Sequence, residues 1–288
     1  MELGTFGVWS LAFSHGDRGE AKDAAAELEE LGYGTLWLGG DPGGNPSGNL
    51  VRADDLLRAT RRVVIATACV SIWAQPADRL AAAYHALPSA RRERLLVGLG
   101  VSHADFVDGY RRPRTALTAY LDGLDTAAPP LPAGARVIGA HGPRMSRLAA
   151  TRSLGVHPYL VDPAHTAQLR SAVGPGPVLA VEQTVVPHTD PGTARARARA
   201  MLAPYLALAN YRGAWLRTGF TEDDLAGGGS DRLIDALFLY GSPDELADQL
   251  TKQRQAGADH IALQVATTDR RFFARSTWRA LAAALPRA

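Results

Sequence analysis

The sequence of 288 residues contains one cysteine, Cys69, and only two lysines, Lys22 and Lys252, among its 31 basic residues. A single cysteine excludes an internal disulfide bond and any metal site built from several cysteines. Cys69 lies inside an apolar run, so we expect it to be a small residue of the hydrophobic core. The other basic residues are arginines, but a formal net charge of +2 is too small to indicate a nucleic-acid partner.

Long hydrophobic segments are also missing from the chain. A segment that crosses a membrane needs about 18 consecutive apolar residues, and the chain has no such segment. The N-terminus also lacks the charged-then-apolar pattern of a signal peptide. We therefore expect a cytoplasmic protein with no membrane partner. An apolar fraction of 46% and a charged fraction of 21% are typical of a folded globular protein. The length is compatible with two domains or with one α/β barrel.

Short apolar segments alternate with segments of helical periodicity along the chain. Near-continuous apolar runs are typical of parallel strands buried on both faces, and they occur at 3–8, 35–38, 63–70, 95–99, 137–138, 156–161, 177–186 and 261–265. Between them, helices are predicted at 18–31, 54–60, 78–87, 113–124, 143–150, 166–173, 243–255 and 272–285. This order predicts an α/β fold, a (β/α)8 TIM barrel that forms a single domain over residues 1–288.

An open doubly wound sheet is the alternative architecture, and it is disfavoured because no G-x-G-x-x-G sequence follows the first strand. Residues 187–240 contain several helical patterns, including one over 231–239, and predict a helical insertion after strand seven. We expect this insertion to be a lid or a dimer surface.

Chemistry in a barrel of this kind occurs where the strands end at their carboxyl termini. The polar candidates at those positions are Ser10, Asp41, Ser71, His103, His141, His157 and Gln183. No nucleophile triad or metal-binding motif is present among them. Both lysines fall in predicted helices, which disfavours a barrel aldolase or isomerase with a lysine at a strand end.

The turn after the fifth predicted strand, at His141 to Met145, is a candidate anion site. Gly142 allows close approach of the backbone, and Pro143 suits the first position of a helix. Free N–H groups at the start of this helix favour a phosphate, and Arg144 adds a positive charge. The alternative is an ordinary strand-to-helix turn with a surface arginine.

Seven motifs carry a resemblance to a known family, and they run through nearly the whole chain. They are E-L-G-Y-G-T-L-W-L-G-G (30–40), V-G-L-G-V-S-H (97–103), G-P-R-M (142–145), G-V-H-P-Y-L-V (155–161), E-Q-T-V-V (182–186), G-G-S-D-R-L-I-D-A-L (228–237) and A-G-A-D-H-I-A-L-Q-V (256–265). With these motifs the chain resembles the luciferase-like monooxygenase superfamily, in its branch of coenzyme F420-dependent oxidoreductases.

The resemblance implies a TIM barrel, usually dimeric, that binds a flavin-like ring system over the strand C-termini. It places the cofactor phosphate on His141, Gly142, Pro143, Arg144 and Met145. It also implies a bulge with a non-proline cis peptide at Ser71-Ile72, behind the ring, and a pocket wall at His157, Pro158 and Tyr159.

His103 occupies the position where some relatives have a glutamate that donates a proton. A histidine there could protonate a substrate while hydride arrives from the reduced ring; otherwise it only hydrogen-bonds the cofactor. The loop after strand two departs from the family pattern. Several relatives have an acidic or histidine-containing loop there, whereas this chain has Gly39 to Gly44, with Asp41 its one charged residue.

The function expected from the resemblance is hydride transfer between coenzyme F420 and a small organic substrate, by a homodimer of this chain with no bound metal. The alternatives are an FMN-dependent monooxygenase that uses dioxygen and a non-catalytic protein that binds a flavin or deazaflavin. F420 and FMN both present a phosphate and a fused planar ring, so the residues alone do not separate the two cofactors.

Overall fold

A closed parallel barrel forms the centre of the protein, in a computed structural model that describes residues 1–41, 44 and 48–286. The barrel strands in chain order are β1 (Phe6–Ser10), β2 (Thr35–Gly39), β3 (Val64–Ala68), β5 (Leu95–Gly100), β6 (Arg136–Ile138), β7 (Gly155–Val156), β8 (Val178–Val186) and β10 (His260–Val265). Neighbouring strands in this order are hydrogen-bonded, and pairing of β10 with both β8 and β1 closes the barrel. The predicted (β/α)8 TIM barrel with a helical insertion is confirmed.

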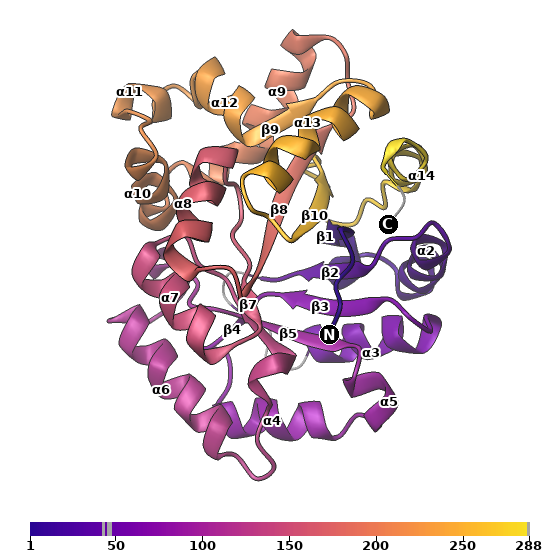
Figure 1. Ribbon diagram of the computed structural model, residues 1–288, viewed down its shortest axis with the longest axis vertical. Helices are drawn as coiled ribbons and strands as arrows, with labels where there is room; N and C mark the ends of the chain where they lie inside the picture. Colours follow the sequence, from indigo (N-terminus) through magenta and orange to yellow (C-terminus); the bar gives the residue numbers. More distant parts are fainter. Residues whose placement is uncertain (42–43, 45–47, 287–288) are drawn as a thin grey trace.

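Helices surround the barrel and cover its outer face (Figure 1). They are α1 (Ala12–His15), α2 (Arg18–Glu30), α3 (Gly48–Ala59), α4 (Ala77–His85), α5 (Ser89–Arg92), α6 (Pro113–Thr126), α7 (Pro143–Arg152), α8 (Pro163–Val173), α13 (Pro243–Gln255) and α14 (Arg275–Ala284). Short 3-10 turns η1 (Ala104–Phe106) and η2 (Ala133–Ala135) lie in the loops. Within the described residues, no helix is both long and apolar enough to span a membrane.

Alternation along the strands divides the core into two layers. In β2, Leu36 and Leu38 point outward into the large cluster between strands and helices, whereas Trp37 points inward. The inner cluster also contains Val64, Ala66, Leu96, Val137, Ala180 and Ala262 from the other strands. Side chains therefore fill the lower part of the barrel, as in other barrels of this size.

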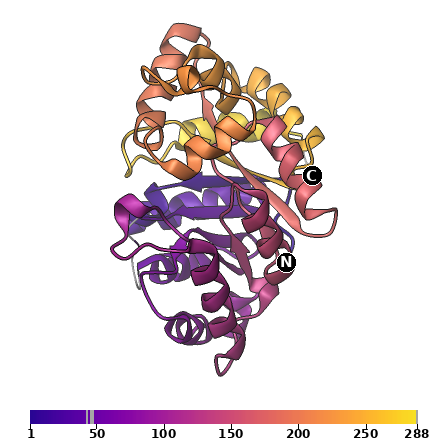
Figure 2. The same cartoon turned by 90° about the vertical axis from the view of Figure 1, so that its left-hand side faces the viewer.

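The insertion after β8 has a hydrophobic cluster of its own. It contains α9 (Pro191–Leu202), η3 (Ala203–Tyr205), α10 (Ala209–Arg217), α11 (Glu222–Leu225) and α12 (Asp231–Leu237), whose apolar side chains pack together. These elements lie together at one end of the molecule, drawn in salmon to orange in Figures 1 and 2. Trp215 of α10 ties the insertion to the barrel, since its Nε1 atom donates to the Leu160 oxygen at 3.1 Å.

Three local predictions were wrong. The helix predicted over 231–239 ends at Leu237, and β9 (Phe238–Tyr240) then pairs with the end of β8. The strand predicted over 156–161 ends at Val156, because Pro158 has no N–H to donate and Leu160 has a φ of 53°. The strand predicted over 63–70 is divided into β3 and β4 (Val70–Ser71) at Cys69.

The non-proline cis peptide implied at Ser71-Ile72 lies elsewhere, between Ala68 and Cys69. Ser71 instead continues the parallel ladder with β5, and the Ile72 N–H donates to Gly100 at 3.0 Å. Cys69 is partly exposed rather than a core residue, because it lies at this break in the strand. Within the loop from Gly39 to Gly44, residues 42–43 lie outside the described residues.

Candidate active site at the mouth of the barrel

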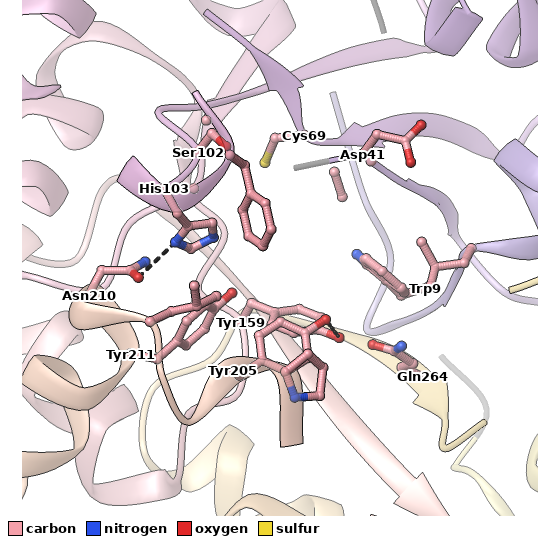
Figure 3. Close-up of a pocket in the computed structure, with 18 of the residues that line it drawn as sticks. Trp9, Asp41, Cys69, Ser102, His103, Tyr159, Tyr205, Asn210, Tyr211 and Gln264 are labelled. Atoms are coloured by element: carbon pink, nitrogen blue, oxygen red, sulfur yellow. Dashed lines mark hydrogen bonds between the residues drawn. The ribbon is translucent and has the colours of Figure 1, made fainter. Parts of the chain in front are cut away.

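A cavity of about 510 Å³ opens over the carboxyl ends of the barrel strands (Figure 3). Its walls come from residues at or just after the strand ends, among them Trp9, Asp41, Cys69, Ser71, His103, His141, His157, Tyr159 and Gln264. Its roof comes from the insertion, with Met201, Tyr205, Leu208, Asn210 and Tyr211. The insertion therefore covers the place where barrel chemistry is expected.

Five of the eleven predicted cofactor-binding and catalytic residues meet in this cavity. Ser71, His103, His141, His157 and Tyr159 line it. Ile72 packs in the main hydrophobic core, and the Pro158 oxygen accepts the Glu182 N–H at 3.0 Å, so both lie behind the wall. Of the other strand-end candidates, Ser10 caps the Ala12 N–H and Gln183 bonds to Leu237 and Gln253, and neither lines the cavity.

His103 lies between the barrel and the roof. Its Nδ1 atom is 2.8 Å from the side-chain oxygen of Asn210, and its ring stacks on Tyr211 at a centroid distance of 5.5 Å. Burial lowers the pKa of His103, while the hydrogen bond to Asn210 and the charge of Asp105 oppose that shift. The backbone reaches this position through Ser102, which has a φ of 56°. His103 is thus a titratable group held against the cavity.

Two further histidines in the wall are neutral. Burial lowers the pKa of His141 to about 3 and that of His157 to about 4. His157 donates its Nδ1 proton to the Ala180 oxygen at 2.8 Å and stacks on Trp37 at 4.2 Å. With that proton placed on Nδ1, the Nε2 atom of His157 is a hydrogen-bond acceptor, and it has no partner among the described residues.

Three tyrosines meet where the wall joins the roof, Tyr159 from the wall and Tyr205 and Tyr211 from the insertion. The hydroxyls of Tyr159 and Tyr205 are 3.3 Å apart, and the Tyr205 and Tyr211 rings meet edge to face at 5.1 Å. Burial raises the pKa of all three hydroxyls, so they stay protonated at neutral pH. Although the Cys69 residue is partly exposed, its thiol is enclosed by its neighbours, and this burial raises the thiol pKa to about 12, which excludes a thiolate nucleophile at neutral pH.

Glu182 lies behind these tyrosines and has a structural role. Its two carboxylate oxygens accept from the Leu160 N–H at 3.0 Å and from the Thr184 hydroxyl at 2.6 Å. These contacts hold the chain at Leu160, where it leaves the barrel. Burial raises the pKa of this carboxyl to about 7, so the group is only partly charged at neutral pH.

The charged residues of the wall, Asp41 and Arg270, pair with each other at the rim. Arg270 Nη2 donates to Asp41 Oδ1 at 2.5 Å, and His15 lies 3.3 Å from the same oxygen. This pair connects the loop after β2 with the loop after β10. The Asp41 carboxylate is therefore engaged in a contact at the rim and is not free.

The start of α7 lies directly beside the cavity. Gly142 is the residue before the helix and Pro143 its first residue, as predicted, and the first turn contains no acidic side chain. Arg144 is exposed there, whereas Met145 packs against the main core. Arg217 of α10 reaches the same turn, where its Nη2 atom lies 3.5 Å from the His141 oxygen.

The sequence patterns did not indicate several residues at the cavity, which come from the first strand, the insertion, the last strand and the loop after it. They are Trp9, Tyr205, Asn210, Tyr211, Arg217, Gln264 and Arg270. The spacing of Tyr205, Asn210 and Tyr211 matches no motif, and their short helices lack a clear apolar period. The one signal was the predicted position of the insertion over the strand ends. Among the described residues, no group of histidine, cysteine, aspartate and glutamate side chains could hold a metal ion.

Comparison with solved structures identifies the fold. No protein-family model matches the sequence, and no curated protein matches it. An F420-dependent secondary alcohol dehydrogenase in complex with an F420-acetone adduct matches with a TM-score of 0.71 and 14% identity, over 99% of both chains. The chain has the fold of these oxidoreductases.

Two other structures support the same assignment. The coenzyme F420-dependent tetrahydromethanopterin reductase from Methanopyrus kandleri matches with a TM-score of 0.68 and 12% identity, over 99% of both chains. The FMN complex of the oxygenating constituent of 3,6-diketocamphane monooxygenase from Pseudomonas putida matches with a TM-score of 0.66 and 13% identity, over 96% of both chains. The resemblance inferred from the sequence is therefore confirmed as a shared fold.

Proposed function

We propose that this protein is an oxidoreductase that binds coenzyme F420 at the mouth of the barrel and transfers hydride between it and a small organic substrate. The observation that carries the proposal is the cavity itself, which combines a largely aromatic wall, with its one ion pair at the rim, and the positive start of a helix at one side. A ligand with a fused planar ring and a phosphate on its side chain would place the ring against the aromatic wall and the phosphate at the helix start.

The residues of the cavity fit such a group. Buried polar atoms without partners among the described residues include Trp9 Nε1, His141 Nδ1, His157 Nε2 and Gln264 Oε1, all in cavity-lining residues. Unpaired buried polar atoms are costly, and a ring system with carbonyl and N–H groups can satisfy them. The Tyr159, Tyr205 and Trp9 rings supply apolar contact area.

The phosphate would bind at the start of α7. Two arginines, Arg144 and Arg217, lie at this turn, and no salt bridge of either is found among the described residues. A cation beside the positive end of a helix is unfavourable unless an anion lies between them. The backbone of His141, Gly142 and Pro143 would border the same anion.

The chain's own contribution to the reaction is positioning and proton transfer. When bound, a reduced deazaflavin supplies the hydride. His103, held against the cavity by Asn210 and Tyr211, would give a proton to the substrate during reduction and take one during oxidation. The roof residues would exclude bulk water from this exchange.

The test is equilibrium binding of F420 and of FMN to the purified protein, followed by anaerobic reduction and mixing with oxygen. We expect micromolar or tighter binding of F420, weaker binding of FMN, and slow reaction of the reduced complex with oxygen. Tight FMN binding without F420 binding, and rapid oxygen consumption, would make the protein a monooxygenase instead. Binding without turnover of any alcohol, ketone or alkene would make it a cofactor carrier. The homodimer expected from the resemblance stays a prediction for sedimentation analysis.

A further inference from the structure

A hydrogen bond between the insertion and the catalytic candidate joins Asn210 to His103, which are 107 positions apart in the chain. We propose that Asn210 is a positioning residue that keeps the proton of neutral His103 on Nδ1 and presents Nε2 to the cavity. This inference rests on the proposed function for its consequence in turnover, but the geometry stands independently of any cofactor.

The proton inventory of the pair supports the assignment. The Asn210 side-chain oxygen, 2.8 Å from Nδ1, can only accept a hydrogen bond, so Nδ1 carries the proton in the neutral ring. The other ring nitrogen lies on the opposite side of the imidazole, away from Asn210 (Figure 3). No hydrogen bond of Nε2 is found within the described residues, so this atom is available to a ligand.

Two consecutive residues of α10 hold the ring. Asn210 fixes its edge and Tyr211 stacks on its face with an interplanar angle of 27°, while Phe106 meets it edge-on at 5.8 Å. Helix α10 is itself tied to the barrel through Trp215 and the Leu160 oxygen. Residues of the insertion therefore fix the orientation of the His103 imidazole as well as covering it.

The arrangement also suits an imidazole that gains and loses a proton at Nε2 in each turnover. In the imidazolium form both nitrogens carry protons, and loss of the Nε2 proton to a substrate leaves the proton on Nδ1. That proton is already hydrogen-bonded to Asn210, so no change of tautomer is needed in either direction. The same logic operates where an acceptor orients a catalytic histidine in other enzymes.

The groups that face His103 set its protonation. Asp105 in η1 raises its pKa, and the nearby rings of His141 and Tyr211 are uncharged at neutral pH. Asn210→Asp would place a carboxylate at the same distance, which should raise the pKa of His103 by about 1–3 units. Asn210→Ala removes the acceptor, which should lower that pKa and release the tautomer.

The experiment is 15N and 1H NMR of the imidazole in the full-length protein without cofactor, with His103→Gln to assign the signals. We expect the Nδ1–H tautomer in the wild type and in Asn210→Asp, and a mixture or the Nε2–H tautomer in Asn210→Ala. Leu216→Ala, an exposed change on the same helix, should leave the signals unchanged. A wild-type Nε2–H tautomer, or a tautomer and pKa of His103 that do not respond to Asn210, would overturn the proposal.

Turnover separates this proposal from the proposed function. If the protein reduces a substrate, the loss of rate at high pH should move upward in Asn210→Asp and downward in Asn210→Ala. If the His103 tautomer changes in Asn210→Ala but the protein shows no turnover with F420 or FMN, the positioning role would stand and the proposed enzymatic function would be refuted. Turnover that depends on His103 but has the same pH profile in all Asn210 variants would refute the positioning role alone.

Discussion

The guanidinium of Arg217 lies over the turn that begins α7, with its Nη2 atom 3.5 Å from the backbone oxygen of His141. The positively charged guanidinium of an insertion residue and the partial positive charge at the N-terminus of α7 therefore lie at the same turn. Burial lowers the pKa of Arg217, as expected for a cation that gains no carboxylate partner in exchange. This relationship is the structural basis of the proposed phosphate site.

Loss of either arginine should weaken cofactor binding. We expect Arg217→Ala and Arg144→Ala each to cost ~1.5–3 kcal/mol, the value of a hydrogen bond to a charged group. Fluorescence titration of the cofactor measures the change, and unfolding curves should hardly move. Arg147→Ala is the matched control, because it removes an exposed arginine from the second turn of the same helix. Unaltered affinity with a lower melting temperature in Arg144→Ala would make that residue structural.

Replacement of His103 should separate an enzyme from a cofactor carrier. General acid catalysis typically contributes ~10²–10⁴-fold, so His103→Ala should reduce turnover within that range. Cofactor affinity should fall far less, since the start of α7 is untouched. Turnover as a function of pH should lose the limb in which the rate falls as the imidazolium deprotonates. His188→Ala, outside the cavity, is the control. Normal turnover with an unchanged pH profile would remove His103 from the mechanism.

Buried neutral histidines should make the protein sensitive to acid. His260 accepts the Trp37 Nε1–H at Nε2, 3.0 Å away, and donates Nδ1–H to the Gly4 oxygen at 2.8 Å. Its pKa is lowered from 6.5 to about 4, so the unfolded chain binds this proton before the native protein does. The stabilisation is therefore present above pH ~6.5 and is lost as pH falls towards ~4.

His260→Gln isolates this contribution, because glutamine keeps a hydrogen-bond acceptor and does not titrate. The free energy of unfolding from denaturant curves should fall less steeply with acid in the variant. The difference in slope should approach ~1.4 kcal/mol per pH unit, for up to about 3 kcal/mol over the window. Parallel curves for the wild type and the variant between pH 7 and 4 would show that His260 does not titrate as its burial requires.

The ion pair at the rim should affect access more than chemistry. Arg270 and Asp41 connect two loops that line the cavity, and both side chains are partly exposed. Such pairs contribute ~0–1 kcal/mol, so Arg270→Gln should leave the free energy of unfolding nearly unchanged. We expect faster binding and release of ligand, seen by stopped-flow mixing, with an affinity within a few fold. The conservative Arg270→Lys should retain wild-type rates; identical rates in Arg270→Gln would exclude a gating role.

The local pattern of residues determined the elements of this fold and part of its site. Apolar runs bounded by glycine and proline predicted the barrel strands, and Gly142 with Pro143 predicted where α7 begins. The position of His103 just after a buried strand predicted that it would line the cavity. These predictions succeeded because periodicity, helix starts and strand ends depend on residues that are neighbours in the chain.

Tertiary structure decided everything that joins distant segments. Asn210 meets His103 and Arg217 meets His141 only because the insertion folds back over the strand ends. The cis bond at Ala68-Cys69 and the pairing of Phe238–Tyr240 with β8 likewise depend on surroundings that no short window contains. Short helices and two- or three-residue strands have too few residues for a period to register, and their partners are selected by packing and by the need to pair buried polar groups.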